Sequence, residues 1–214
     1  ADADTALAVE KVASQVMTTV KTIAAAAEGT GANAEDAANQ AFDSIVTVLQ
    51  SKASSSETLN FANTTDLTSV KTQAKSKLAS LSGIDTTSFN TTLDTAMDSV
   101  KLVNDVINNI TDTDLTSNAN KGVFAAADHL KTQTKTAATA EKATPGSGNQ
   151  HITMNDADAV DTVVNSATSN AAPTDISLSK TSIAENSSSL TFTATTTDDS
   201  SSSFTYTLSG ADAS

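Results

Sequence analysis

Residues 89–110 carry the signal that most constrains this chain, an apolar residue at every third or fourth position over the whole segment. This spacing puts one continuous apolar stripe on an α-helix, whereas a strand would need alternation with a period of two. The stripe consists of Phe89, Leu93, Ala96, Val100, Val103, Ile107 and Ile110. Such a stripe has to be covered by other apolar surfaces, so the segment indicates a helical bundle.

Four further segments repeat the helical period less regularly. They span residues 4–28, 34–52, 65–82 and 115–138. The expected apolar face of the first is Val9, Val12, Val16, Val20, Ile23 and Ala27, and that of the second is Ala38, Ala41, Phe42, Ile45, Val48 and Leu49. Asn33 and Asp85 precede two of these helices as candidate N-caps. The sequence therefore predicts a mainly α fold, with an antiparallel bundle of about five helices over residues 1–142.

Composition leaves one alternative open. Leu, Ile, Val and Phe account for only 41 of the 214 residues, and the formal net charge is −13. These values approach those of disordered chains, so the helices could also be ordered only within a larger assembly. The excess of 25 acidic over 12 basic residues argues against nucleic-acid binding. The absence of cysteine excludes disulfides and thiolate metal sites, and no apolar run is long enough for a transmembrane segment.

The pattern changes at Ala143. Residues 144–149 read Thr-Pro-Gly-Ser-Gly-Asn, so we expect a linker over residues 143–172, with room for a short helix near 155–165. After Pro173 the apolar residues alternate with Thr and Ser, as in short strands. A β-sandwich needs about 100 residues. Residues 173–214 are therefore expected to be its N-terminal part, completed by residues beyond 214 or by another chain.

The same residues resemble the first half of a bacterial cadherin-like repeat. The resemblance rests on Ala172-Pro173-Thr174-Asp175-Ile176-Ser177-Leu178-Ser179, Ser182-Ile183-Ala184-Glu185-Asn186, Thr197-Asp198 and Phe204-Thr205-Tyr206-Thr207-Leu208. Such repeats occur in very large secreted surface proteins. The preceding Ala/Thr-rich region is similar in composition to helical modules that adjoin these repeats. The resemblance implies an immunoglobulin/cadherin-like sandwich, an extracellular location at the bacterial cell surface, and a role in adhesion, a surface layer or a matrix.

The resemblance also implies calcium at repeat junctions. Glu185 matches the glutamate of the Pro-Glu-Asn motif, Asp198 the first aspartate of the Asp-x-Asp motif, and Asn170 the junction asparagine. Ser200 replaces the second aspartate of Asp-x-Asp. Because calcium takes six to eight oxygen ligands, these residues need others from outside the segment to complete a site.

Other candidate sites have simpler explanations. Asp112-x-Asp114 and Asp156-x-Asp158 begin like calcium loops, but both lack the glycine and the glutamate that an EF-hand requires. We expect Asp112 or Thr113 to cap the helix that follows. His129 and His151 are the only histidines and lie on separate segments. Lys71, Lys75 and Lys77 are expected to form a solvated helix face.

These observations predict a non-enzymatic structural or adhesive protein, a segment of a larger bacterial surface protein whose partners are itself, other surface proteins, a matrix or a host surface. The alternative is a self-assembling filament or surface-layer subunit in which the helical region polymerises. Completion of the partial sandwich by another chain would favour the self-assembling subunit, whereas a monomer in calcium with further repeats after residue 214 would favour the adhesive protein.

Overall fold

A computed structural model describes residues 2–168, 175–178 and 194–197. The chain divides into two compact units, residues 1–168 and 169–214. The helices are α1 (Ala3–Gly29), α2 (Ala34–Ser54), α3 (Thr64–Leu78), α4 (Thr86–Asn108), α5 (Asn118–Ala143) and α6 (Ala157–Thr168), with a short 3₁₀ helix, η1 (Gly148–His151). The prediction of a mainly helical fold is confirmed for this part of the chain.

Two predicted caps fix the starts of α2 and α4. The Asn33 carboxamide oxygen accepts the Glu35 N–H at 2.9 Å. The Asp85 carboxylate accepts the Thr87 N–H at 3.0 Å and the Ser88 hydroxyl at 2.7 Å. These bonds satisfy amides that have no partner inside the first helical turn, so both helices begin where the sequence indicated.

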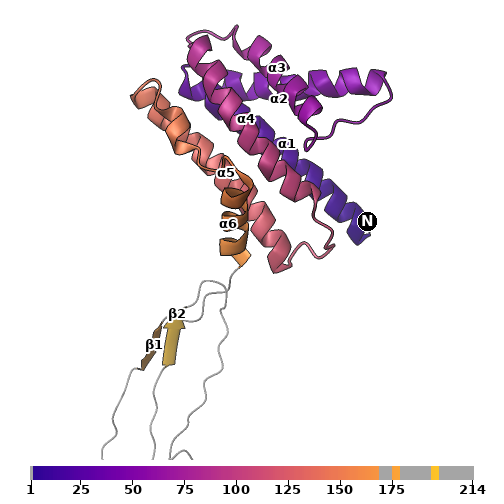
Figure 1. Ribbon diagram of the computed structural model, residues 1–214, viewed down its shortest axis with the longest axis vertical. Helices are drawn as coiled ribbons and strands as arrows, with labels where there is room; N and C mark the ends of the chain where they lie inside the picture. Colours follow the sequence, from indigo (N-terminus) through magenta and orange to yellow (C-terminus); the bar gives the residue numbers. More distant parts are fainter. Residues whose placement is uncertain (1, 169–174, 179–193, 198–214) are drawn as a thin grey trace, which may run out of the picture. The chain divides into compact units, whose positions relative to one another are not determined.

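Three long helices lie side by side in the helical unit, and α2 and α3 form a hairpin across one end of them (Figure 1). The Asp85 N–H at the start of α4 donates to the Thr30 carbonyl after the end of α1 at 2.7 Å. Lys142, near the end of α5, pairs with Glu28 at 2.8 Å. Helix α4 is therefore antiparallel to both α1 and α5, which run parallel to each other.

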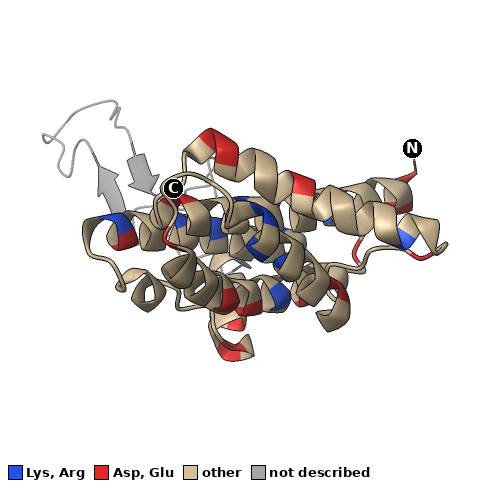
Figure 2. Cartoon of the chain, turned by 90° about the horizontal axis from the view of Figure 1, so that it is seen from above, with Lys and Arg blue, Asp and Glu red and all other residues tan. Residues whose placement is uncertain are grey.

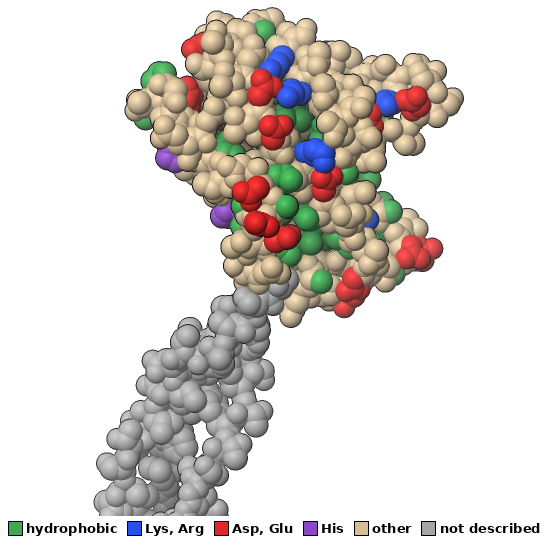
Figure 3. All heavy atoms as spheres, viewed as in Figure 1, with side chains coloured by type: hydrophobic (Ala, Val, Ile, Leu, Met, Phe, Trp, Pro, Cys, Tyr) green, Lys and Arg blue, Asp and Glu red, His purple; other side chains and the backbone are tan. Residues whose placement is uncertain are grey.

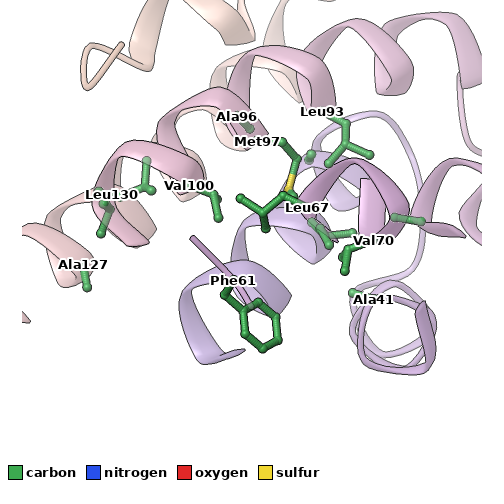
Figure 4. Close-up of a cluster of buried hydrophobic side chains, with 14 of the residues drawn as sticks. Ala41, Phe61, Leu67, Val70, Leu93, Ala96, Met97, Val100, Ala127 and Leu130 are labelled. Atoms are coloured by element: carbon green, nitrogen blue, oxygen red, sulfur yellow. The ribbon is translucent and has the colours of Figure 1, made fainter. Parts of the chain in front are cut away.

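The apolar stripe of α4 is the centre of the core, as its spacing predicts. All seven of its residues are buried, and Phe89, Leu93 and Val100 have no exposed surface. Side chains from α2, α3 and α5 surround it, together with Phe61 from the loop before α3 (Figure 4). This loop is held by the buried Asn104 side chain, whose Nδ2 donates to the Phe61 carbonyl at 3.1 Å.

Gly29 sets the distance between the ends of α1 and α5. A Cβ atom at this position would lie 2.6 Å from the Ala138 Cα. Real side chains do not approach a backbone so closely, so a glycine is needed where these helices touch.

The expected apolar face of α1 is wrong in its N-terminal half. Val9 and Val12 are 64% and 53% exposed, whereas Gln15, Thr18 and Thr22 are buried. The same correction applies to α2, where Phe42 and Leu49 are 54% and 49% exposed although Ala41 and Ile45 are buried. Hydropathy alone therefore does not separate the buried from the exposed positions of these two helices.

The start of α5 also differs from the expectation. Ser117 is the N-cap, and its hydroxyl oxygen accepts the Asn120 N–H at 3.3 Å. Asp112, the expected cap, instead accepts the Asp114 N–H at 3.0 Å in a turn before the helix. The buried Asn120 side chain closes that turn by donating to the carbonyls of Asp112 and Asp114.

Residues 143–168, expected as part of a linker, belong to the helical unit. The Glu141 carboxylate accepts the N–H groups of Gly146 and Gly148 at 2.6 and 2.7 Å and so fixes the glycine-rich turn after α5. Ile152, Met154 and Val160 are then buried in the common core. The short helix predicted near 155–165 is α6, which packs along α5.

The second unit contains two described strands, β1 (Asp175–Leu178) and β2 (Ala194–Thr197). They pair antiparallel, with Asp175 opposite Thr197 and Leu178 opposite Ala194. The other predicted strands lie outside the described residues. The cadherin-like sandwich therefore stays a prediction.

Candidate interaction surface

The predicted calcium ligands Asn170, Glu185 and Asp198 all lie outside the described residues. Within the described ranges, no group of three or more His, Cys, Asp or Glu side chains is placed to hold a metal ion. The calcium prediction thus remains untested.

The two aspartate pairs that resembled calcium loops are used locally. Asp114 accepts the N–H and the hydroxyl of Thr116 at 2.9 and 2.7 Å. The bond from the hydroxyl, followed by that from the N–H, lowers the pKa of Asp114. Asp156 accepts the Ala159 N–H at 2.8 Å at the start of α6. Both carboxylates therefore stabilise turns and helix starts.

The two histidines do not form a pair. The His129 ring contacts the Gln133 side chain one turn along α5, with 2.9 Å between the two Nε2 atoms, and His151 ends η1. Both side chains are exposed, and they appear as separate purple patches in Figure 3. The arrangement offers no shared general base or metal ligand set.

The three lysines of α3 do more than line a solvated face, because each pairs with an aspartate of a neighbouring helix. Lys71 and Lys75 lie 2.9 and 2.7 Å from Asp94 of α4, and Lys77 pairs with Asp43 of α2. Burial raises the pKa of Asp94, but the bonds from both lysines outweigh it and lower the pKa. Figure 2 shows this interspersion of basic and acidic positions along the helices.

The surface feature that stands out is an apolar stripe on the outside of α1. We call it the outer stripe; it comprises Val9, Val12, Val16, Met17 and Val20. Val9, Val12 and Met17 are each about half exposed or more, whereas Val16 and Val20 are partly buried and also pack against the core. Single exposed apolar residues are ordinary, but a stripe over three helical turns is typical of a protein contact.

Polar bonds to the end of α4 hold α1 in this orientation. Lys11 Nζ donates to the carbonyls of Asn108 and Ile110 at 2.6 and 2.9 Å. Gln15 Nε2 donates to the Asn104 carbonyl at 3.1 Å. Carbonyls in the last turn of a helix lack partners within it, and a cation is favourable there. Satisfying them from α1 turns its Thr/Gln face inward and its valines outward.

The inward face is an unusual one for a core. Thr18 and Thr22 have no exposed surface, and their hydroxyl oxygens have no hydrogen-bond partner among the described residues. Burying an unpaired hydroxyl is unfavourable. The small size of threonine nevertheless lets α1 approach α4 and α5 closely. Sequence reasoning missed this face because residues 15, 18, 22 and 26 show the helical period only if polar residues are counted.

A groove continues the exposed surface toward the other end of α1. It has a volume of about 620 Å³ and lies between α1, α2 and α5. Its lining residues are Lys21, Ala24, Ala25, Glu28, Ala34, Ala38, Asp128, Lys131, Thr132 and Lys135. Met17 lies one turn before Lys21 on α1, and Phe42 lies one turn after Ala38 on α2, so the outer stripe and the exposed Phe42 flank the groove.

Comparison with known proteins gives no relative: the chain matches no protein-family model, no curated protein and no solved structure. Among the described helices, none combines the length and apolar character that crossing a bilayer requires.

Proposed function

We propose that this chain is a non-enzymatic structural or adhesive segment of a larger bacterial cell-surface protein, acting by protein–protein contact. The observation that carries the proposal is the outer stripe of α1, with Val9 and Val12 more than half exposed. A contiguous apolar stripe on a folded unit favours a binding surface, because a partner that covers it removes apolar area from water.

The extracellular location and the cadherin-like repeat are proposed because the residues around and after Pro173 resemble such a repeat. Asn170, Glu185 and Asp198 would contribute oxygen ligands to calcium at the junction with the next repeat, and further ligands would come from beyond residue 214. The chemistry fits, because calcium prefers carboxylate and amide oxygens.

Surface labelling of intact cells tests the location. Antibodies raised against the helical unit should label intact, unpermeabilised cells of the source bacterium. Labelling that appears only after permeabilisation would exclude a surface role.

Isothermal titration with calcium tests the predicted calcium site. The chain joined to the residues that follow it should bind calcium, and Glu185→Ala should weaken that binding.

The alternative function is that of a self-assembling filament or surface-layer subunit. The exposed apolar residues of α1 and α2 support it as well, since a polymer needs a contact between copies. Electron microscopy of the concentrated, purified protein separates the two functions. Ordered polymers favour the subunit, and discrete particles favour the adhesin segment.

A further inference from the structure

Between Val9 and Thr22 the outer stripe of α1 is more apolar than the face that α1 turns to the core. The buried apolar residues of that face lie at its two ends and are Leu7, Ile23, Ala26 and Ala27. Outside lie Val9, Val12 and Met17, and inside lie Gln15, Thr18 and Thr22. An amphipathic helix in a monomeric bundle normally buries its more apolar face. The outward valines therefore point to a partner that covers them in the assembled protein.

Two charges along one edge of the stripe identify this partner. Glu10 and Lys21 are both exposed, have no ion pair within the described residues, and stand eleven positions apart. Eleven residues are about three helical turns, so both side chains lie on the same edge of α1. One edge thus carries opposite charges on either side of Val16.

This arrangement is complementary to itself when the helix direction is reversed. If a second α1 lies antiparallel across the stripe, with the twofold axis beside Val16, Glu10 of each copy faces Lys21 of the other. The two valines at position 16 meet at the centre, and Val12 faces Val20. A parallel twofold pair would put the charged edges of the two copies on opposite sides of the contact, so Glu10 and Lys21 would not meet. A twofold contact of this kind repeats each favourable interaction twice.

The groove receives the end of the incoming helix. In this antiparallel register the first turn of one α1 lies over the last turns of the other, where Ala24 and Ala25 form part of the groove floor. The first turn carries Asp2 and Asp4. The small floor residues leave room for a helix backbone to approach.

The charges around the groove favour this end of the helix. Its lining contains three lysines and two acids. Both acids already have partners, because Glu28 pairs with Lys142 and Asp128 with Lys131. Lys135 has no ion pair among the described residues, so an acidic helix end adds a favourable charge contact there.

We propose that the helical unit forms a twofold dimer in which α1 pairs antiparallel with α1 of a second copy through the outer stripe, Glu10 and Lys21. The inference rests on the proposed function, because it names the partner that a structural surface protein requires, a second copy of this chain.

Sedimentation velocity of the 214-residue chain over a range of concentrations tests the dimer. The native chain should dimerise, and Val9→Lys combined with Val12→Lys should weaken dimerisation at least about tenfold, since burying two lysines in place of two valines is unfavourable. Leu49→Lys is the matched control, because Leu49 is 49% exposed on α2 but lies neither in the stripe nor in the lining of the groove. Circular dichroism should show unchanged helix content in each variant. A native chain that stays monomeric, or a dimer lost only in Leu49→Lys, would overturn the proposal.

Charge exchange tests the antiparallel register. Glu10→Lys alone and Lys21→Glu alone should each weaken dimerisation about tenfold, because each puts like charges opposite one another at two symmetric positions. An equimolar mixture of the two variants should restore it, since the mixed dimer again has two opposite-charge pairs. No restoration would rule out this register. Surface labelling of cells is independent of all these results, so failure of the dimer and failure of the proposed surface role are told apart.

Discussion

Asp66 is the most buried carboxylate whose pKa shifts in the helical unit. Burial by itself raises its pKa, but the hydrogen bond from Lys52 at 2.7 Å, the Asn60 N–H at 2.9 Å and the lysine charge together outweigh burial and lower it. The carboxylate thereby joins the end of α2, the loop before α3 and the first turn of α3. Its charge strengthens both the Lys52 and the Asn60 contacts.

We predict that Asp66→Asn lowers the unfolding free energy by about 1–3 kcal/mol at pH 7, because a buried charged hydrogen bond is lost. The folded pKa lies below the ordinary aspartate value of about 3.9. The stabilisation is therefore complete above about pH 5 and is lost as the pH falls through the folded pKa. Urea unfolding from pH 7 to pH 2 should show the native chain and the variant converging at low pH.

Asp98→Asn is the control for that measurement. Asp98 is exposed on α4 and has no ion pair among the described residues. Its replacement should leave stability at pH 7 nearly unchanged. A constant difference between native protein and Asp66→Asn across the whole pH range would contradict the role given to the Asp66 charge.

At the scale of single residues, two of the helix N-caps could be predicted from the sequence. Asn33 and Asp85 cap helices as expected because an N-cap bond involves only residues two or three positions away. The prediction of Asp112 as the N-cap of α5 was wrong, and Ser117 is the cap. Several Asp, Ser and Thr residues in that loop could cap the helix, so the sequence alone did not decide between them. The contact that decides between them is Asn120, a residue of the following helix.

Among the elements, α4 and α1 mark the limits of periodicity as a guide. Helix α4 touches neighbours along one continuous face, and its apolar stripe was sufficient to identify that face. Helix α1 is oriented by Lys11 and Gln15, which reach residues about ninety positions away. No local pattern contains that information, so Val9 and Val12 were assigned to the wrong side.

A second prediction concerns the contact between Gly29 of α1 and Ala138 of α5. Gly29→Ala places a Cβ within 2.6 Å of the Ala138 Cα, so one of the two helices has to move. Overpacking of this kind costs about 1–3 kcal/mol. Thermal unfolding followed by circular dichroism should show a lower midpoint for Gly29→Ala. A midpoint equal to or above the native value would mean that the helix ends separate freely.

At the scale of the whole molecule, the boundary near residue 168 is the main revision to the sequence-based organisation. Composition indicated a break at residue 143, and the Thr-Pro-Gly-Ser-Gly-Asn run does form a turn there. The chain nevertheless returns to the same core through Ile152, Met154 and Val160. Glu141, which holds the turn, is a single buried acid that a composition profile does not detect.

We predict that residues 1–168 fold independently and that residues 1–142 are less stable. The shorter fragment loses α6 and exposes the part of α5 that α6 covers. Three buried apolar side chains contribute about 1.5–3 kcal/mol each to the longer fragment. Circular dichroism should show mostly helical spectra for both, with a clearly lower unfolding midpoint for residues 1–142. Equal midpoints would show that α6 does not stabilise the unit.

The pairing of α1 with the last turn of α4 and the end of α5 also bears on how the chain folds during synthesis. The partners of Lys11 lie 97 and 99 residues further along the chain, and the partner of Glu28 lies 114 residues further along. While the ribosome elongates the chain, α1 emerges first but has no core to join until α4 and α5 have followed. The α2–α3 hairpin, whose contacts are local, should form before α1 docks. During this delay the face of α1 that later packs on α4 and α5 is open to solvent, so the nascent helix is the segment on which a chaperone would act.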